Sequence, residues 1–118
     1  MLTEKNFSAA LKAMNFAERG NCFEKIFADN ITMRADLQSR KLFYPAQIKN
    51  HNRNNFYDES HRENLVVFEC VNRLLDKGYK PEDITLEKSW SLGHTQKSGR
   101  ADICVAQDDK IILIIECK

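Results

Sequence analysis

Two apolar runs at the C-terminal end constrain the fold most, because each carries charged residues where it begins or ends. Gly99-Arg100-Ala101-Asp102 opens the first run, and the second, Ile111 to Ile115, leads into Glu116-Cys117-Lys118. Side chains alternate across a strand, so Glu116 and Lys118 are expected on one face and Cys117 on the other. Charge on an otherwise apolar strand needs a reason. A bound divalent cation is the reason that we expect here.

Length and composition describe an ordinary single domain. The 118 residues, 42% of them hydrophobic and 30% charged, give room for one compact soluble core. Residues 1–10 include Glu4 and Lys5, and no apolar run is long, so we expect neither export nor a membrane span, and a cytoplasmic location. The net charge of +1 gives the chain almost no electrostatic attraction for a phosphate backbone, so binding of nucleic acid would require a local basic patch or other domains.

The four cysteines, Cys22, Cys70, Cys104 and Cys117, are far apart in the sequence. No Cys-x-x-Cys pair accompanies them, which argues against a structural zinc site. We expect reduced thiols. Three of them, Cys70, Cys104 and Cys117, lie in apolar segments and are expected to pack as small core residues rather than to react.

The N-terminal region, residues 1–45, is predicted to contain a helix and a β-meander. Apolar residues recur at helical spacing over Glu4 to Ala17, and Gly20 is the predicted stop. Three alternating segments follow, separated by turn residues, at 22–27, 31–37 and 41–44. Residues 46–60 are polar and rich in asparagine, and we interpret them as a linker. Its Lys49 and Arg53 are candidates for contact with a phosphate backbone, and a solvated linker is the alternative.

Residues 61–118 are predicted to form a helix followed by strands. Ser60 and Glu63 have the spacing of a capping box, and an apolar stripe then runs to Gly78. Pro81-Glu82-Asp83 predicts a turn and Ile84 to Leu92 a strand. After a polar loop at 93–99, strands are expected at 100–106 and 110–118, with a tight turn at 107–109. The sequence therefore predicts a mixed fold of helices and strands, α/β in the broad sense and α+β in the order of its elements.

Asp102 and Glu116 suit a magnesium site. If the last two strands form an antiparallel hairpin, the two carboxylates meet at one end of the sheet, within reach of one ion. Magnesium on carboxylates can activate water and neutralise a phosphate, as phosphodiester hydrolysis requires. Lys118 would share the face of Glu116 and help to orient the water, and Glu63 is a further ligand or water-positioning group.

These residues resemble the PD-(D/E)xK nuclease superfamily. The wider pattern, from Glu63-Asn64 through Leu74-Leu75-Asp76-Lys77-Gly78 to Ile114-Ile115-Glu116-Cys117-Lys118, is similar to the N-terminal nuclease domain of type I restriction R subunits. It is also similar to single-chain restriction-modification enzymes, in which a nuclease precedes an N6-adenine methyltransferase. The resemblance implies a restriction-endonuclease-like core that hydrolyses double-stranded DNA with Mg²⁺, or Mn²⁺ as a substitute.

The same resemblance implies roles for individual residues. Asp102, Glu116, Glu63 and the backbone carbonyl of Cys117 would be metal ligands, and Lys118 would be the catalytic lysine. Glu69 competes with Glu63 for the role of helix carboxylate. The implied partners are DNA and downstream methyltransferase or helicase domains of the same polypeptide.

Two features depart from the family pattern. Ala101 stands at the proline position, and the sequence stops at Lys118, before a segment that related nucleases often carry. We therefore expect a fragment, truncated at its lysine, that is inactive alone.

Several alternatives remain open at this point. Asp102 and Glu116 are also typical of solvated charges at a strand end. Arg100 and Lys97 flank the predicted metal site and are candidates for DNA contact, with a solvated loop as the alternative. A non-catalytic DNA-binding or docking module would share this fold, and a repair nuclease would share the chemistry.

Overall fold

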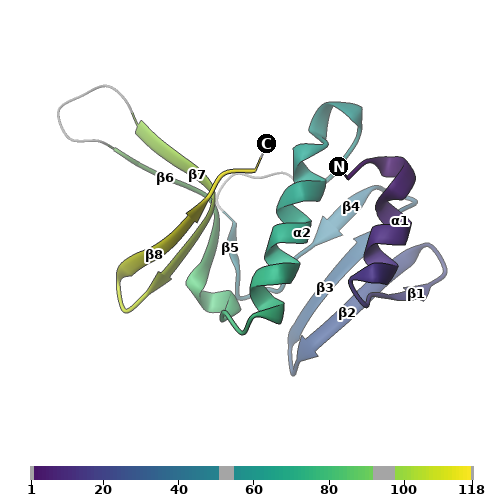
Figure 1. The fold of residues 1–118 in the computed structure, drawn as a ribbon, viewed down its shortest axis with the longest axis horizontal. Helices are drawn as coiled ribbons and strands as arrows, with labels where there is room; N and C mark the ends of the chain where they lie inside the picture. Colours follow the sequence, from purple (N-terminus) through teal and green to yellow (C-terminus); the bar gives the residue numbers. More distant parts are fainter. Residues whose placement is uncertain (1, 51–54, 92–97, 118) are drawn as a thin grey trace.

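The computed structural model describes residues 2–50, 55–91 and 98–117 of the chain. Within these residues the fold is α+β, as the sequence predicted, and it comprises two α-helices and two four-stranded sheets. The longer helix, α2, lies between the two sheets (Figure 1). The elements are α1 (Glu4–Ala13), β1 (Ala17–Arg19), β2 (Cys22–Ala28), β3 (Ile31–Asp36), β4 (Lys41–Phe43), β5 (Lys49–Asn50), a 3-10 turn (Glu59–His61), α2 (Glu63–Asp76), a second 3-10 turn (Pro81–Asp83), β6 (Ile84–Ser91), β7 (Ser98–Gln107) and β8 (Lys110–Ile115).

Helix α1 ends four residues earlier than predicted. Asn15 adopts a left-handed φ of 72°, and the Phe16 amide donates to the carbonyl of Leu11 at 2.9 Å. These are the features of a Schellman C-cap, which an asparagine can supply in place of glycine. The prediction that Gly20 stops this helix is therefore wrong. Gly20, with a φ of +65°, instead lies in the turn between β1 and β2.

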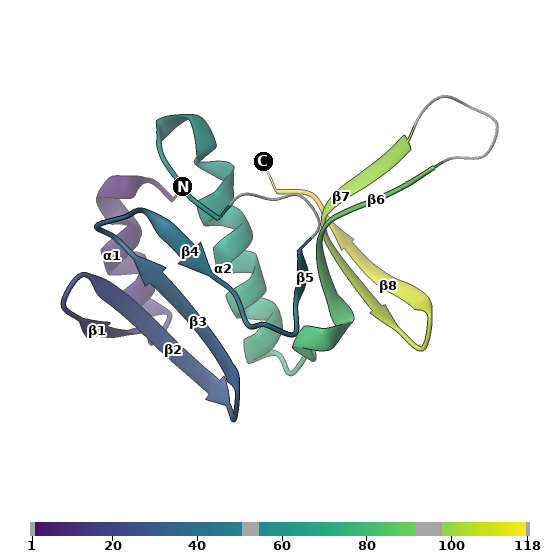
Figure 2. The ribbon, with the colours of Figure 1, turned by 180° about the vertical axis from the view of Figure 1, so that it is seen from behind.

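The N-terminal sheet has the order β1-β2-β3-β4, with antiparallel neighbours. The three predicted strands of the meander are β2, β3 and β4, so this part of the prediction is confirmed. Strand β1 was not expected, because residues 17–19 were assigned to the end of the helix or left unassigned. In Figure 2 this sheet lies in front of α1 and α2.

The segment predicted as a polar linker contributes to the fold. Lys49 and Asn50 form β5, which pairs in parallel with Thr85 and Leu86 of β6. Ile48 and Tyr57 from the same segment are 7% and 3% exposed and belong to the hydrophobic core. A segment without an apolar period can therefore anchor the chain through two well-placed side chains.

Helix α2 begins later than the capping box implies. Ser60 lies inside the 3-10 turn, and its amide donates to the carboxylate of Asp58 at 2.8 Å. Asp58 therefore provides the side-chain cap here, and the prediction of Ser60 as N-cap of the helix is wrong. At the other end the prediction is confirmed. Gly78 has a φ of +95° and the Tyr79 amide donates to the carbonyl of Leu74, which completes a Schellman motif.

The C-terminal sheet has the order β5-β6-β7-β8. Strands β6, β7 and β8 are antiparallel neighbours, and β7 with β8 forms the hairpin that the sequence predicted. A two-residue turn at Asp108-Asp109 joins these two strands. Both aspartates have positive φ values, 51° and 64°, as a type I′ hairpin turn requires. Residues 92–97, which include most of the predicted polar loop, lie outside the described residues.

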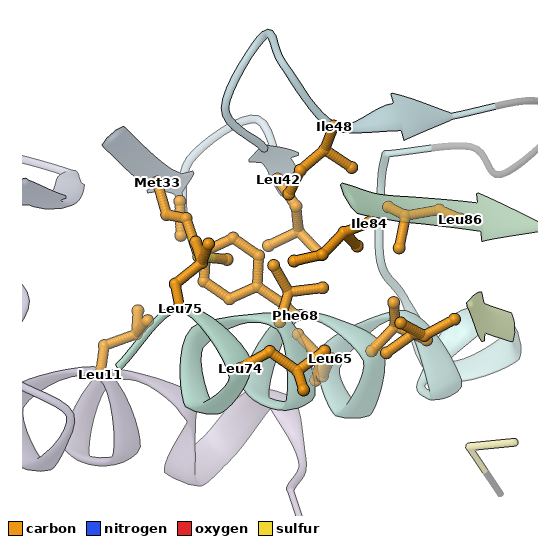
Figure 3. Close-up of a cluster of buried hydrophobic side chains, with 14 of the residues drawn as sticks. Leu11, Met33, Leu42, Ile48, Leu65, Phe68, Leu74, Leu75, Ile84 and Leu86 are labelled. Atoms are coloured by element: carbon orange, nitrogen blue, oxygen red, sulfur yellow. The ribbon is translucent and has the colours of Figure 1, made fainter. Parts of the chain in front are cut away.

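The hydrophobic core is one cluster that includes residues of both helices and both sheets. Phe68 of α2 is fully buried, and its ring contacts those of Phe7, Phe16 and Tyr44 at centroid distances of 5.6–6.1 Å. Figure 3 shows Phe68 amid aliphatic side chains from the N-terminal sheet, the linker and β6. Among the described residues, neither α1 nor α2 has the length and apolar character that crossing a membrane requires.

Candidate functional site

Asp102 is the fifth of the ten residues of β7, which begins at Ser98, so the prediction that Asp102 lies at the start of its strand is wrong. Its carboxylate binds the backbone that follows β8. The amide of Cys117 donates to Asp102 Oδ2 at 2.8 Å. Cys117 lies between the two other residues of the predicted motif, Glu116 and Lys118. The structure therefore brings Asp102 directly against the segment that the sequence predicted as its partner.

Glu116 follows β8 and is exposed. The last pair of the β7–β8 ladder joins Ile103 to Ile115, and continuing that register by one residue places Glu116 opposite Asp102. Opposed residues of an antiparallel pair project from the same face. Ile103 is part of the core beside α2, so strand alternation places the Asp102 side chain on the other face of the sheet.

The helix carboxylates do not join this pair. Glu63 is the first residue of α2 and is exposed, on the side of the sheet that α2 covers. Glu69 is held by Arg73, with 2.7 Å between Oε1 and Nη2. Over residues 2–50, 55–91 and 98–117, no three His, Cys, Asp or Glu side chains are placed to hold a metal ion. The three-carboxylate set of Asp102, Glu116 and Glu63 is therefore not gathered here.

Four further predicted site residues are Lys118, Lys97, Arg53 and Arg100. Lys118, Lys97 and Arg53 lie outside the described residues. The backbone of Arg100 pairs with Ser89 of β6, which puts Arg100 two residues before Asp102 on β7, but its side chain lies outside the description. Their roles stay predictions.

Lys49 lies away from Asp102. Its ammonium group is 3.5 Å from the carbonyl oxygen of Glu82, near the start of β6. It also lines an open hollow of about 490 Å³ together with the acidic residues Asp83, Asp108 and Asp109. Neighbouring carboxylates weaken the attraction of a lysine for phosphate, so the structure does not join Lys49 to a basic surface around Asp102.

Two cysteines that the sequence analysis assigned to packing lie side by side near this site. The Cys117 thiol donates to Cys70 Sγ across 3.8 Å, and both residues are half-buried. This hydrogen bond lowers the pKa of Cys70 to about 7, against the opposing effects of burial and Glu69. They are 47 positions apart, so no local spacing could have predicted the pair. Cys104 is buried, as expected.

Glu87 is an acidic residue near Asp102 that the sequence did not predict. The pairs Leu86–Ile103 and Lys88–Ala101 bracket it, and the register places it opposite Asp102 on β6. Its φ of 55° is unusual for a non-glycine residue within a strand. The Leu86-Glu87-Lys88 sequence resembles any half-exposed strand, so it contains no signal for this position.

Residues 58–118 match the family model described as type I restriction enzyme R protein N terminus. The match covers just over half of the chain and extends from the turn before α2 through the segment with Asp102 and Glu116. The chain belongs to this family, and it is therefore a restriction-enzyme domain, as its sequence predicted. No curated protein and no solved structure matches the chain.

Proposed function

We propose that this chain is a Mg²⁺-dependent endonuclease domain that hydrolyses phosphodiester bonds of double-stranded DNA. It would serve as the cleavage module of a restriction-modification protein, with target recognition outside this domain. Downstream methyltransferase or helicase domains of the same polypeptide would be its partners. One observation carries the proposal. The 2.8 Å bond from the Cys117 amide to Asp102 holds a carboxylate against the strand end that precedes Lys118. Membership of the restriction family supports it.

The donor groups at this strand end fit magnesium. Mg²⁺ prefers hard oxygen ligands and is usually bound by one or two carboxylates, with water and substrate phosphate completing its coordination. Asp102 and Glu116 supply two carboxylates in opposed register positions, and the Cys117 carbonyl adds a backbone oxygen. The exposure of Glu116 leaves room for water and phosphate.

Each residue of the chain then has a distinct task. When bound, the ion would neutralise charge on the scissile phosphate and favour ionisation of the attacking water. Asp102 and Glu116 would bind the ion, and the Cys117 amide keeps the Asp102 carboxylate oriented. Lys118 would orient the attacking water and offset phosphate charge. Glu63 would support a second ion or the water after a rearrangement, because it starts on the side of the sheet that α2 covers.

A thermal-unfolding titration with Mn²⁺ or Mg²⁺ tests the metal site. A ligand that binds only the folded state adds about 2.7 kcal/mol at 100 times its dissociation constant. Asp102→Asn is expected to abolish this stabilisation, because the amide oxygen can still accept from Cys117 while the negative charge is gone. Asp108→Asn is the matched control. It makes the same change at the opposite end of the hairpin, where asparagine tolerates the positive φ.

DNA cleavage by the restriction protein that contains this domain tests the chemistry. Asp102→Ala and Lys118→Ala are each expected to abolish double-strand cleavage, whereas Asp108→Asn should cleave normally. Cleavage that survives both alanine variants would refute the proposed roles.

A non-catalytic DNA-binding or docking module is the second candidate function. The observation that favours it is that, in the described parts of the chain, three metal-binding side chains do not converge. The metal titration separates the two functions. A docking module predicts the same unfolding temperature with and without Mn²⁺, for both the unchanged chain and Asp102→Asn.

A further inference from the structure

The thiols of Cys70 and Cys117 connect two parts of the fold that backbone pairing does not join. Cys70 lies in the middle of α2, and Cys117 lies two residues beyond the last residue of β8. Their sulfur atoms are 3.8 Å apart, with Cys117 donating to Cys70. A disulfide has a sulfur–sulfur distance of about 2.05 Å. A closure of just under 2 Å would therefore convert this contact into a covalent bond.

The segment that contains Cys117 is able to make this movement. The β7–β8 ladder ends at Ile115, so residues 116 and 117 are outside the regular pairing. The Cys117 amide donates a hydrogen bond to Asp102. A shift of the Cys117 side chain towards α2 would thus leave the β7–β8 pairing intact. In Figures 1 and 2 this segment runs from β8 towards α2.

A small oxidant has access to Cys70. An open groove of about 360 Å³ lies between α2 and β8, and Cys70 lines it with Tyr79, Leu113 and Ile115. Both cysteines of the pair are half-buried, as is Cys22, whereas Cys104 is 2% exposed. The pair is therefore the accessible dithiol of the described chain.

We propose that Cys70 and Cys117 form a reversible disulfide that ties the segment after β8 to helix α2. The oxidant is a low-molecular-weight disulfide such as glutathione disulfide. The Cys70 sulfur attacks it, forming a mixed disulfide and releasing one glutathione thiol. The Cys117 sulfur then attacks the Cys70 sulfur and expels the second glutathione. Two protein thiols lose two electrons and two protons, and the small disulfide gains both as two thiols.

The disulfide would also regulate the metal site, and this consequence rests on the proposed function. Cys117 is flanked by Glu116 and Lys118, and its amide orients Asp102. Drawing Cys117 towards α2 moves the backbone that supplies Glu116 and the Cys117 carbonyl away from Asp102. Oxidation is therefore expected to weaken Mn²⁺ binding several-fold, and dithiothreitol should restore it.

The experiment incubates the folded chain with defined ratios of glutathione and glutathione disulfide. Free thiols are then counted after denaturation, and peptide mapping locates the cross-link. The chain has four cysteines, and the count is expected to fall from four to two, with a linked peptide pair containing Cys70 and Cys117. The Cys22→Ser, Cys104→Ala background should form the same link, and adding Cys70→Ser or Cys117→Ser should abolish it.

The outcomes separate this inference from the proposed function. A glutathione adduct on Cys70 that accumulates without the Cys70–Cys117 link in the unchanged chain would overturn the inference, whatever the Mn²⁺ titration shows. A link that forms and weakens Mn²⁺ binding supports both the disulfide and its regulatory effect. A link that forms in a chain that binds no Mn²⁺ in either state supports the disulfide and overturns the metal site instead.

Discussion

Lys25 is a partly buried cation that joins the two helices to the N-terminal sheet. From β2 its ammonium group donates to the Met14 carbonyl at 2.8 Å, to Asn72 Oδ1 at 2.8 Å and to Asp76 Oδ2 at 2.9 Å. Its side chain is only 10% exposed. The ammonium also lies 4.8 Å from the ring centroid of Phe27. One side chain thus satisfies a free carbonyl at the end of α1 and two polar groups of α2.

Replacing Lys25 by Met keeps an unbranched apolar stem but removes the ammonium group and every one of these bonds. Asn72 is 2% exposed, so its oxygen would remain buried without this donor, as would the Met14 carbonyl in part. Each such loss costs about 1–3 kcal/mol. Asp76 is 49% exposed and can be rehydrated, so its share is small. We expect Lys25→Met to lower the free energy of unfolding by about 2–4 kcal/mol, a large part of the 5–15 kcal/mol that is typical of domains.

Urea denaturation followed by circular dichroism measures this loss, and Lys12→Met is the matched control. Lys12 pairs with Glu18 at 3.5 Å, but these side chains are 60% and 52% exposed. An exposed pair contributes about 0–1 kcal/mol, so the control should barely change the midpoint. Equal midpoints for the two variants would refute the role given to Lys25.

Three further predictions concern the core, a helix end and a surface carboxylate. Phe68→Ala should lower the free energy of unfolding by about 3–5 kcal/mol, because it empties the fully buried centre of the core, and urea denaturation measures it. Gly78→Ala should cost about 1 kcal/mol in the same assay, because an L side chain is strained at a φ of +95°; no change would show that α2 can end differently. For Asp58, the hydrogen bond from His61 lowers the pKa below the ordinary aspartate value. The ionised Asp58 carboxylate should therefore stabilise the fold above the unfolded-state pKa, and this stabilisation should be lost as pH falls through the lower folded-state pKa. An NMR titration of Asp58 with a midpoint at the ordinary aspartate value would contradict this.

The sequence predicted the elements whose signals are local. Alternation in residues 22–27 and 31–37 identified β2 and β3, and the apolar stripe before Gly78 identified α2 and its C-terminal end. Elements with non-local causes were missed. Strand β5 has two residues and exists because Thr85 and Leu86 lie beside it in space. Asn15 ended α1 early because asparagine tolerates the left-handed conformation that glycine usually supplies.

The candidate site likewise has a part with a local sequence signal and a part that depends on non-local packing. The hairpin pattern predicted that Asp102 and Glu116 come close together. Their opposed positions also depend on the β-bulge between Val105 and Ala106, which shifts the register by one residue and which the pattern did not predict. The pattern contained no information about which face of the sheet α2 covers. In the structure Glu63 lies on the face that α2 covers, and the Asp102 side chain lies on the other face. The Cys70–Cys117 contact also depends on how α2 packs against the sheet, which no spacing within the sequence encodes.

The position of Mn²⁺ in crystals of this chain tests the central claim most directly, because anomalous scattering locates the ion without reference to activity. The proposed function predicts one Mn²⁺ bound by the carboxylates of Asp102 and Glu116 and by the Cys117 carbonyl. It also predicts that the ion is absent from crystals of Asp102→Asn and present in crystals of Asp108→Asn. Manganese only at the acidic turn of Asp108 and Asp109, or at neither place, would contradict the assignment of this strand end as a nuclease site.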